Sequence, residues 1–304
     1  MSNFLDRLTL LETFVRIAES GSISSAARDL GLTQPSASRQ LAALEDRLKT
    51  QLVRRNTHSL ALTNAGIELL ADARQLLNGW EALAEKHLSP DSELSGSLRI
   101  VAPIALGQSH LIRIAGQFLK NHPKVRIAWE LNDDDIRFTE RGCDCWIRVG
   151  QVPDETLIVR ELGSVRRLLV ASRSLVDMHG LPGTPKKAER YPLVALSPYE
   201  GGKISVLRGQ RVASCTPQVV LETNNIFALK ESVLAGIGMA IVPEWFVVEE
   251  LGNGQLLDIL PGWEAPRLRI SAAYSPGRHR PQRLNVFLKH IADGVLGMKG
   301  IEAP

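Results

Sequence analysis

Apolar positions recur with helical spacing in two short segments near the start of the chain. In the first segment they lie at i, i+3, i+4 and i+7, namely Leu11, Phe14, Val15 and Ala18. The second repeats the same spacing with Ile23, Ala26, Ala27 and Leu30. Residues at these spacings share one face of an α-helix. The pattern therefore predicts two short amphipathic helices, the first of which ends near residues 19–22.

A tight turn is expected between the second helix and a third. Ser22 and Thr33 are candidate N-caps, because their hydroxyls accept hydrogen bonds from free N–H groups at a helix start. Gly31 follows the second helix, where a left-handed residue is favoured, and Pro35 lies in the first turn of the third, where its missing N–H costs little. The apolar face of the third helix consists of Ala37, Leu41, Leu44 and Leu48. Two helices joined by such a turn are typical of a helix-turn-helix.

The opposite face of the third helix is small and polar at its N-terminal end. Pro35, Ser36 and Arg39 point away from the apolar side, while Ser38 and Gln40 flank it. Small residues allow a partner to approach closely, and polar ones can recognise it. The alternative is an ordinary solvated face that carries only capping residues.

Residues 53–62 predict two short strands around a turn at 56–59, with Arg54 and Arg55 at its tip. Residues 34–58 contain five basic and two acidic residues, an excess of three positive charges that equals the net charge of +3 of the whole chain. Because a local basic cluster is the electrostatic signature of a nucleic-acid-binding surface, this segment favours such a partner.

Residues 63–88 predict one long helix, with Thr63 as its N-cap. Two series of apolar residues recur every seven positions, with Ala73 and Trp80 between them: Leu70, Leu77 and Ala84, and Leu69, Leu76 and Leu83. About 25 residues of helix would span roughly 37 Å. We expect the helix to pair with a second copy in a dimer. The alternative is that the stripe packs on the helix's own domain.

The pattern changes after a linker at 89–97, which is rich in serine, proline, glycine and acidic residues. Strands are predicted at 98–102, 125–131, 145–149, 167–171, 219–223, 238–242 and 268–274. Helices are predicted between several of them, at 106–120, 225–235 and 281–296. Strands that alternate with helices favour an α/β domain with a mostly parallel sheet.

Composition narrows the class of protein. The chain has 304 residues, 44% hydrophobic and 23% charged, as expected for a globular protein of about two domains. Charges at Asp6, Arg7 and Glu12 interrupt any signal peptide, and no apolar run is long enough to span a membrane, so we expect a cytoplasmic protein. No pattern typical of a catalytic site, a cofactor site or a metal site appears.

The three cysteines, Cys143, Cys145 and Cys215, do not suggest a disulfide framework. Cys143 and Cys145 would share one face if their segment is a strand, and such a pair admits a redox or metal interpretation. Buried structural cysteine is the favoured interpretation, because free cysteine is commonly buried and no clustered histidines supply further ligands.

Residues 22–66, SISSAARDLGLTQPSASRQLAALEDRLKTQLVRRNTHSLALTNAG, resemble the DNA-binding segment of LysR-type transcriptional regulators. The resemblance covers essentially the whole chain and includes CDCWIRVG at 143–150, ESVLAGIGMAIVPEW at 231–245 and AYSPGRHRPQRLNVFLKHI at 273–291. Two residues depart from the family pattern. Lys49 stands where a glycine usually follows the third helix, and Val53 stands where phenylalanine is common.

The resemblance implies an α+β multidomain fold: a winged helix-turn-helix at 1–62, a dimerisation helix at 63–88, a hinge linker at 89–97 and an effector domain at 98–304. The effector domain would be a two-lobed α/β structure of periplasmic-binding-protein type, with lobe one at about 98–163 and 266–304 and lobe two at about 164–265. The expected partners are double-stranded operator DNA, a small-molecule effector between the lobes, RNA polymerase and further copies of the chain in a homodimer or homotetramer.

For DNA, the N-terminal end of the third helix is expected to contact base edges in the major groove. The residues concerned are Gln34, Pro35, Ser36, Ser38 and Arg39. Arg54 and Arg55 would contact the phosphate backbone or enter the minor groove. The alternative function is an α/β binding protein or enzyme without a role in gene regulation; DNA binding that responds to a metabolite would exclude it.

For the effector, the expected cleft residues are Ala102, Pro103 and Ile104 from lobe one, Ser197, Thr223 and Asn224 from lobe two, and Arg148 at their border. Pro103 occupies a place where many family members have serine or threonine to hold a ligand carboxylate. Its presence argues against a simple carboxylate effector and leaves backbone N–H groups as donors. Alternatively, Thr223 and Asn224 only cap the helix 225–235, and Arg148 only pairs with an acid.

Overall fold

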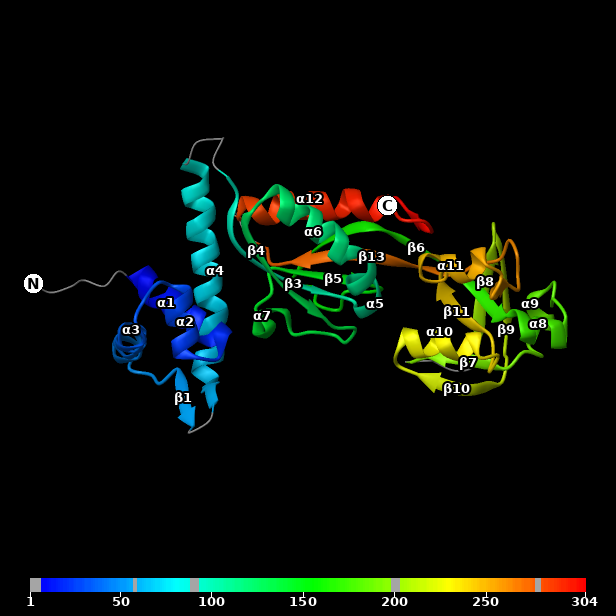
Figure 1. Ribbon diagram of the computed structural model, residues 1–304, viewed down its shortest axis with the longest axis horizontal. Helices are drawn as coiled ribbons and strands as arrows, with labels where there is room; N and C mark the ends of the chain where they lie inside the picture. The colour runs from blue at the N-terminus through cyan, green and yellow to red at the C-terminus, as the bar shows by residue number, and fades with distance from the viewer. Residues whose placement is uncertain (1–6, 57–58, 88–92, 198–202, 277–279) are drawn as a thin grey trace, which may run out of the picture.

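The computed structural model describes residues 7–56, 59–87, 93–197, 203–276 and 280–304. Figure 1 shows three regions along the long axis of the molecule. A small helical unit contains the N-terminal helices, one long helix stands beside it, and a two-lobed α/β domain follows. The order of these regions is the one that the sequence pattern predicts.

The N-terminal unit is a winged helix-turn-helix. Its elements are α1 (Arg7–Ser20), α2 (Ile23–Asp29), α3 (Gln34–Leu48), β1 (Val53–Asn56) and β2 (Ser59–Leu62). The predicted caps are confirmed, because Ser22 Oγ accepts from Ser25 N at 3.4 Å and Thr33 Oγ1 accepts from Ser36 N at 3.3 Å. Gly31 has φ +65°, the left-handed conformation expected after α2.

The core of this unit is built from the apolar faces of the three helices, with Phe14, Ala27 and Leu41 among the buried residues. Gln40 corrects the expected face of α3. We placed it at the flank, but it is buried and its amide oxygen accepts a hydrogen bond from the hydroxyl of Thr13 on α1. A buried amide is acceptable only where it has such a partner, and this pair fixes α3 against α1.

The long helix α4 (Asn64–His87) has two different apolar sides. Leu70 and Ala73 are buried, on a helix that also contacts α1. Leu76, Trp80 and Leu83 are 52%, 53% and 40% exposed. Packing on the helix's own domain is therefore confirmed for part of the helix, and an exposed apolar stripe remains on another side.

The main sheet of the α/β domain has the strand order β11-β6-β13-β5-β3-β4, with β12 and β14 also paired to β6. These strands are β3 (Ser95–Ala102), β4 (Lys124–Leu131), β5 (Cys145–Val149), β6 (Ile158–Ser172), β11 (Ala240–Pro243), β12 (Leu256–Asp258), β13 (Ala265–Tyr274) and β14 (Ile301–Glu302). β3 begins inside the segment 89–97 that we expected to be linker; residues 89–92 of that segment lie outside the described part.

The expectation of a mostly parallel sheet is wrong for this sheet. Only the pairs β3–β4 and β3–β5 are parallel, whereas β13 is antiparallel to β5 and β6, and β11, β12 and β14 are antiparallel to β6. The reason is that β6 and β13 are long strands that carry the chain between the lobes in opposite directions (Figure 1). They pair with each other on the way, with Leu268 opposite Val165.

The helices of the first lobe pack against this sheet. They are α5 (Ile104–Leu106), a π-helical turn η1 (Gly107–Leu111), α6 (Ile112–Asn121), α7 (Phe138–Arg141) and α12 (Gln282–Leu296). The first three form one helical stretch that begins two residues before the predicted 106–120. α12 agrees with the predicted 281–296 within one residue.

The second lobe contains smaller sheets and short helices. The parallel pair is β7 (Leu193–Leu196) and β10 (Val219–Thr223), and the antiparallel hairpin is β8 (Ile204–Arg208) and β9 (Arg211–Cys215). The helices are α8 (Arg173–His179), α9 (Pro185–Ala188), α10 (Ile226–Leu234), η2 (Glu244–Phe246) and α11 (Val248–Gly252). We did not predict the hairpin, although its alternating pattern and the turn at Gly209, with φ +59°, were a signal for it.

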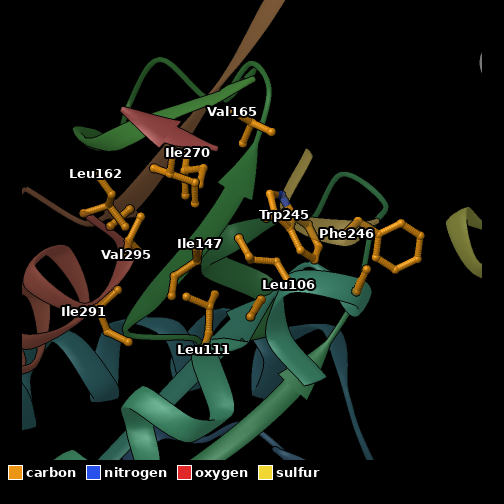
Figure 2. Packing of buried hydrophobic residues seen from close by; sticks show 14 of the residues in the cluster. Leu106, Leu111, Ile147, Leu162, Val165, Trp245, Phe246, Ile270, Ile291 and Val295 are labelled. Carbon is orange, nitrogen blue, oxygen red and sulfur yellow. The ribbon is translucent and has the colours of Figure 1, made fainter. Parts of the chain in front are cut away.

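The largest apolar cluster contains residues of both lobes. Figure 2 shows Leu106, Ile147 and Ile291 of the first lobe together with Trp245 and Phe246 of the second. The lobes are therefore connected by packed side chains as well as by β6 and β13. This core holds the edges of the cleft described below in a defined arrangement.

Candidate functional site

The N-terminal end of α3 presents the predicted recognition residues to solvent. Gln34, Pro35 and Arg39 are exposed, and Ser36 and Ser38 are half-buried. The opposite face is buried in the core through Ala37, Leu41 and Leu44. The structure thus separates a packing face from an accessible polar face, as the sequence pattern predicts.

The wing lies next to this helix because one carboxylate joins them. Glu45 Oε1 of α3 accepts from Leu52 N at 2.8 Å and Val53 N at 3.2 Å. The wing strands pair with Arg54 opposite Ala61, and the Arg54 side chain is exposed. The side chain of Arg55 and residues 57–58 lie outside the described part. Sequence reasoning missed the role of Glu45, because its partners are backbone groups that no residue pattern reveals.

A cavity of about 700 Å³ lies between the two lobes. It brings together four of the predicted effector residues: Pro103, Arg148, Ser197 and Asn224. Ala102, Ile104 and Thr223 are not among the residues that line it, and Ala102 is fully buried in the core. Leu106, Ile147 and Trp245, drawn as sticks in Figure 2, also line the cavity.

The helix start in lobe one is already occupied by a carboxylate of the chain itself. Asp133 Oδ1 accepts a hydrogen bond from Ile104 N at 2.9 Å, at the beginning of α5. We expected the backbone N–H groups here to be free for a ligand, and for Ile104 that expectation is wrong. The residue responsible lies 29 positions away in sequence, so no local pattern could have shown it.

Arg148 is held by its own acidic partner. Its Nη2 lies 2.7 Å from Asp135 Oδ1, its Nη1 donates to the Asp133 carbonyl at 2.7 Å, and its guanidinium lies 5.2 Å from the centroid of the Trp146 ring. The alternative interpretation, in which Arg148 pairs with an acid, therefore describes this arrangement. Arg148 contributes donors to the cleft wall, but its charge is already compensated.

The lobe-two residues also bond within the chain. Ser197 Oγ donates to Glu222, and Thr223 Oγ1 accepts from Asn225 N at 3.2 Å. The cap of α10 is Asn225, whose Oδ1 accepts from the N–H groups of Phe227 and Ala228 at 2.9 and 3.1 Å. This corrects the alternative interpretation, in which Thr223 and Asn224 only cap the helix. Asn224 lines the cleft instead.

Arg167 is a cleft residue that sequence reasoning missed. It lies on β6, lines the cavity, and donates from Nε to the carbonyl of Pro266 at 2.8 Å and from Nη2 to the same oxygen. Burial lowers the pKa of its guanidinium. No carboxylate of the described residues lies within ion-pair distance of it. The sequence offered one signal for Arg167, namely an arginine within a strand predicted close to the crossing between the lobes.

Side chains from three parts of the chain meet where α4 contacts the first lobe. Glu19 of α1 lies 3.3 Å from Arg74 of α4 and 3.5 Å from Arg99 of β3. Asp144 accepts from Arg99 N at 2.8 Å and from Asn78 Nδ2 at 3.2 Å. These contacts connect the DNA-binding unit to the effector domain.

Arg283 of α12 completes this junction. Its side chain is 4% exposed, pairs with Glu81 of α4, and donates from Nε to the Ser97 carbonyl at 3.0 Å. Gly96 is required beside it, since Gly96 has φ +100° and an added Cβ would lie 3.2 Å from the guanidinium carbon. The backbone of β3 therefore approaches Arg283 as closely as a glycine permits.

The cysteines are buried free thiols. Burial raises the pKa of Cys143 to about 12 and that of Cys215 to about 11, and it raises the pKa of Cys145 as well. Cys143 precedes β5 and packs with Phe138, whereas Cys145 lies in the main core, so the two do not share a strand face. Within the described ranges no cluster of histidine, cysteine and acidic side chains is suited to a metal.

Two family models match the chain. Residues 8–67 match the bacterial regulatory helix-turn-helix of the LysR family, and residues 91–295 match the LysR substrate-binding domain. The chain is 30% identical to the HTH-type transcriptional regulator YhjC of Escherichia coli K12, over 95% of this chain and 97% of that protein. It is 26% identical to the HTH-type transcriptional activator AaeR of the same organism, over 95% and 94%.

Solved structures show the same architecture. The full-length virulence activator AphB of Vibrio cholerae matches with 25% identity and a TM-score of 0.58, over 95% of this chain and 99% of that one. A full-length variant of OxyR from Pseudomonas aeruginosa matches in fold alone, with 16% identity, a TM-score of 0.72 and coverage of 98% and 99%. In the part of the chain that the structure describes, no helix is long and apolar enough to cross a membrane.

Fold, surface and cleft together define a DNA-binding regulator with an effector domain. The chain belongs to the LysR family of transcriptional regulators. Binding of DNA and assembly into oligomers follow from that membership.

Proposed function

We propose that this regulator binds operator DNA through the N-terminal end of α3 and the wing, and that a small molecule in the interlobe cleft modulates that binding. The observation that carries the first part is the exposed polar end of α3 beside the exposed arginine of β1. The cleft of about 700 Å³, lined from both lobes, supports the second part. We propose no catalytic role and no cofactor, since the relatives named above are transcriptional regulators. Its target DNA implies action in the cytoplasm.

The two basic elements would have different tasks. Gln34 can pair bidentately with adenine and Arg39 with guanine, while Ser36 and Ser38 can bond to either. Pro35 contributes a small surface that lets the helix approach the groove. Arg54 and Arg55 would contact phosphates and so add affinity without sequence preference. The α3 residues would therefore determine sequence specificity, and the wing arginines would add affinity for any DNA sequence.

We predict that Arg39→Ala lowers the affinity for an operator selected from random DNA by about 1–3 kcal/mol and relaxes the preference at one base position. Arg54→Ala should weaken binding to all sequences alike and reduce the salt dependence. Gel shifts at fixed salt with selected and scrambled DNA would measure both effects. Arg211→Ala, on the exposed hairpin of the second lobe, is the control. If Arg39→Ala kept the operator affinity and the base preference of the wild type, the assignment of Arg39 to base contacts would be wrong.

We further propose that α4 forms the dimer interface, with the chain divided into domains at 1–62, 63–88, 89–97 and 98–304. The exposed apolar residues of α4 support this, because a helix rarely leaves such a stripe uncovered. A twofold dimer would place two α3 helices on half-sites one helical turn, or a multiple of it, apart. Two such dimers would form the homotetramer, and contact with RNA polymerase would follow from the position of the bound tetramer.

A further inference from the structure

We propose that the cleft selects a small apolar monoanion, and that Arg167 is the residue that binds its charge. The proposal rests on the proposed function of the cleft and names the chemical class of its effector. It follows from the charges that line the cavity, from the partners that each of them has, and from the apolar character of the remaining wall.

Within the described part of the chain, the charged residues that line the cavity are Asp133, Asp135, Arg148 and Arg167. Asp135 and Arg148 form an ion pair at 2.7 Å. Asp133 accepts the N–H of Ile104 at 2.9 Å. Among the described residues, Arg167 is the cavity cation without a carboxylate partner. The cavity therefore contains one positive charge that an incoming ligand can compensate.

Arg167 directs two donors at one neutral acceptor. Both Nε and Nη2 donate to the carbonyl oxygen of Pro266. A carbonyl oxygen satisfies hydrogen bonds but does not neutralise a guanidinium. A carboxylate can accept two parallel N–H bonds from the same group and also compensates its charge, which the carbonyl does not. A ligand anion would thus displace a weaker partner.

The helix start in lobe one does not offer an equivalent anion site. Its first N–H group is bonded to Asp133, whose negative charge would repel a second anion at that position. A ligand with two anionic groups would meet this carboxylate or Asp135. One anionic group at Arg167, which has no ion pair with either acid, fits this distribution of charge.

The remaining wall is mostly apolar, with Asn132, Gln151, Ser197 and Asn224 as its polar members, and it favours an apolar body. Leu106, Ile147, Leu193, Ile241 and Trp245 line the cavity from both lobes. A cavity of about 700 Å³ lies in the range of about 300–1,000 Å³ that small-molecule sites occupy. Aromatic or branched aliphatic carboxylates combine such a body with a single negative charge.

Arg167 also lies at the passage between the lobes. It is on β6, and its acceptor Pro266 is on β13, at a position where the register between the two strands shifts. A ligand that competes for the guanidinium would release the Pro266 carbonyl. Binding would thereby change a contact between the two strands that connect the lobes.

The test compares acids with their uncharged amides on the full-length protein. Benzoate and 4-methylpentanoate are the acidic probes, benzamide and 4-methylpentanamide the neutral ones, and phthalate the dianion. Isothermal titration should show at least tenfold tighter binding of one acid than of its amide and of phthalate. In Arg167→Met this preference should disappear, and in Arg167→Lys it should be retained in part. Arg166→Met, which removes a neighbouring arginine that pairs with Glu244 and Glu264 instead, should leave it unchanged.

Each outcome decides the proposal. Equal binding of acids and amides to the wild type, or binding of neither, overturns the assignment without requiring any variant to fold. An acid preference that survives in Arg167→Met overturns the role of Arg167. If the amides bind and change operator affinity in gel shifts, the cleft keeps its proposed function and only the monoanion class is wrong. If no change in operator affinity follows any bound probe, the cleft's regulatory function fails separately.

Discussion

Lys49 shows how one backbone angle explains a departure from the family pattern. It has φ 52°, and it is the only residue other than glycine with positive φ in the described part of the chain. It ends α3 in a left-handed conformation, with its N–H bonded to the carbonyl of Asp46 at 3.3 Å. This is the position where the resemblance led us to expect glycine, because glycine adopts that conformation without steric cost.

Lys49→Gly should therefore stabilise the protein by about 0.5–1 kcal/mol. Relief of the left-handed strain exceeds the greater chain entropy that glycine adds to the unfolded state. The lost ion pair with Asp46 is exposed and contributes little. Urea unfolding monitored by circular dichroism would measure the change. A lower midpoint than that of the wild type would show that the strain is compensated elsewhere.

Cys143 should behave as an unreactive thiol. With its pKa raised to about 12, its thiolate is scarce at neutral pH. Alkylation of the native protein by iodoacetamide should keep rising about tenfold per pH unit beyond pH 9, where an ordinary thiol levels off. The folded state disfavours the thiolate. Cys143 therefore contributes to the stability of the fold below about pH 9, and this contribution is lost as pH rises toward 12. Peptide mapping would assign the alkylation rate to Cys143. A plateau of that rate near pH 9 would show that the thiol is not buried as described.

For single residues, the sequence predicted caps and turns that act on neighbouring positions, but it did not predict contacts with distant segments. Ser22, Thr33 and Gly31 act within four residues of their own position, so pattern and residue type suffice to place them. Asp133 and Glu45 act on backbone groups of other segments. Nothing in their surroundings in the sequence distinguishes them from solvated acids.

Among the elements, α4 has a side that the single chain does not cover. Leu83→Gln should weaken self-association, because Leu83, Leu76 and Trp80 form one exposed stripe. Ile67→Gln is the matched control, since Ile67 is also 40% exposed but lies on nearly the opposite side of the helix. Sedimentation velocity over a concentration series would compare them. An equal effect of both variants would place the dimer contact elsewhere on the chain.

Helices were easier to predict than strand directions. α4 and α12 agree with their expected bounds because a period of 3.6 over many residues is a strong signal. β6 extends over Ile158–Ser172, whereas only 167–171 was predicted. Its first three residues, Ile158, Val159 and Arg160, are exposed, since that part is held by pairing with β13 rather than by burial of alternate side chains. The pairing partners of a strand, and hence its direction relative to them, depend on how the chain passes between the two lobes.

In the whole molecule, Arg283 is one of the residues that join α4 to the effector domain. Arg283→Met should lower the free energy of unfolding by roughly 2–3 kcal/mol, because it leaves Glu81 without its cation and removes one of the two arginines, with Arg74, that stabilise the buried Asp144 carboxylate. Arg267→Met is the control, since its pairs with Glu264 and Glu302 are more exposed and should contribute little.

Operator affinity without effector should stay close to that of the wild type in Arg283→Met, because α3 and the wing are untouched. Chemical unfolding and gel shifts on the same preparation would separate the two effects. A loss of operator affinity equal to the loss in Arg39→Ala would show that the junction also positions the recognition helices. Stability unchanged from that of the wild type would show that the junction contributes no net free energy.

Asp133 has one more consequence. A carboxylate that is part of the chain competes at the helix start with any external acid, at a high effective concentration. Any acid that relied on this helix start would have to be far more abundant, because its apparent affinity is reduced by the fraction of molecules in which Asp133 is displaced. Asp133 thus acts as an intramolecular competitor of acids that would bind at this helix start. A single substitution there would be the shortest evolutionary route to a new inducer.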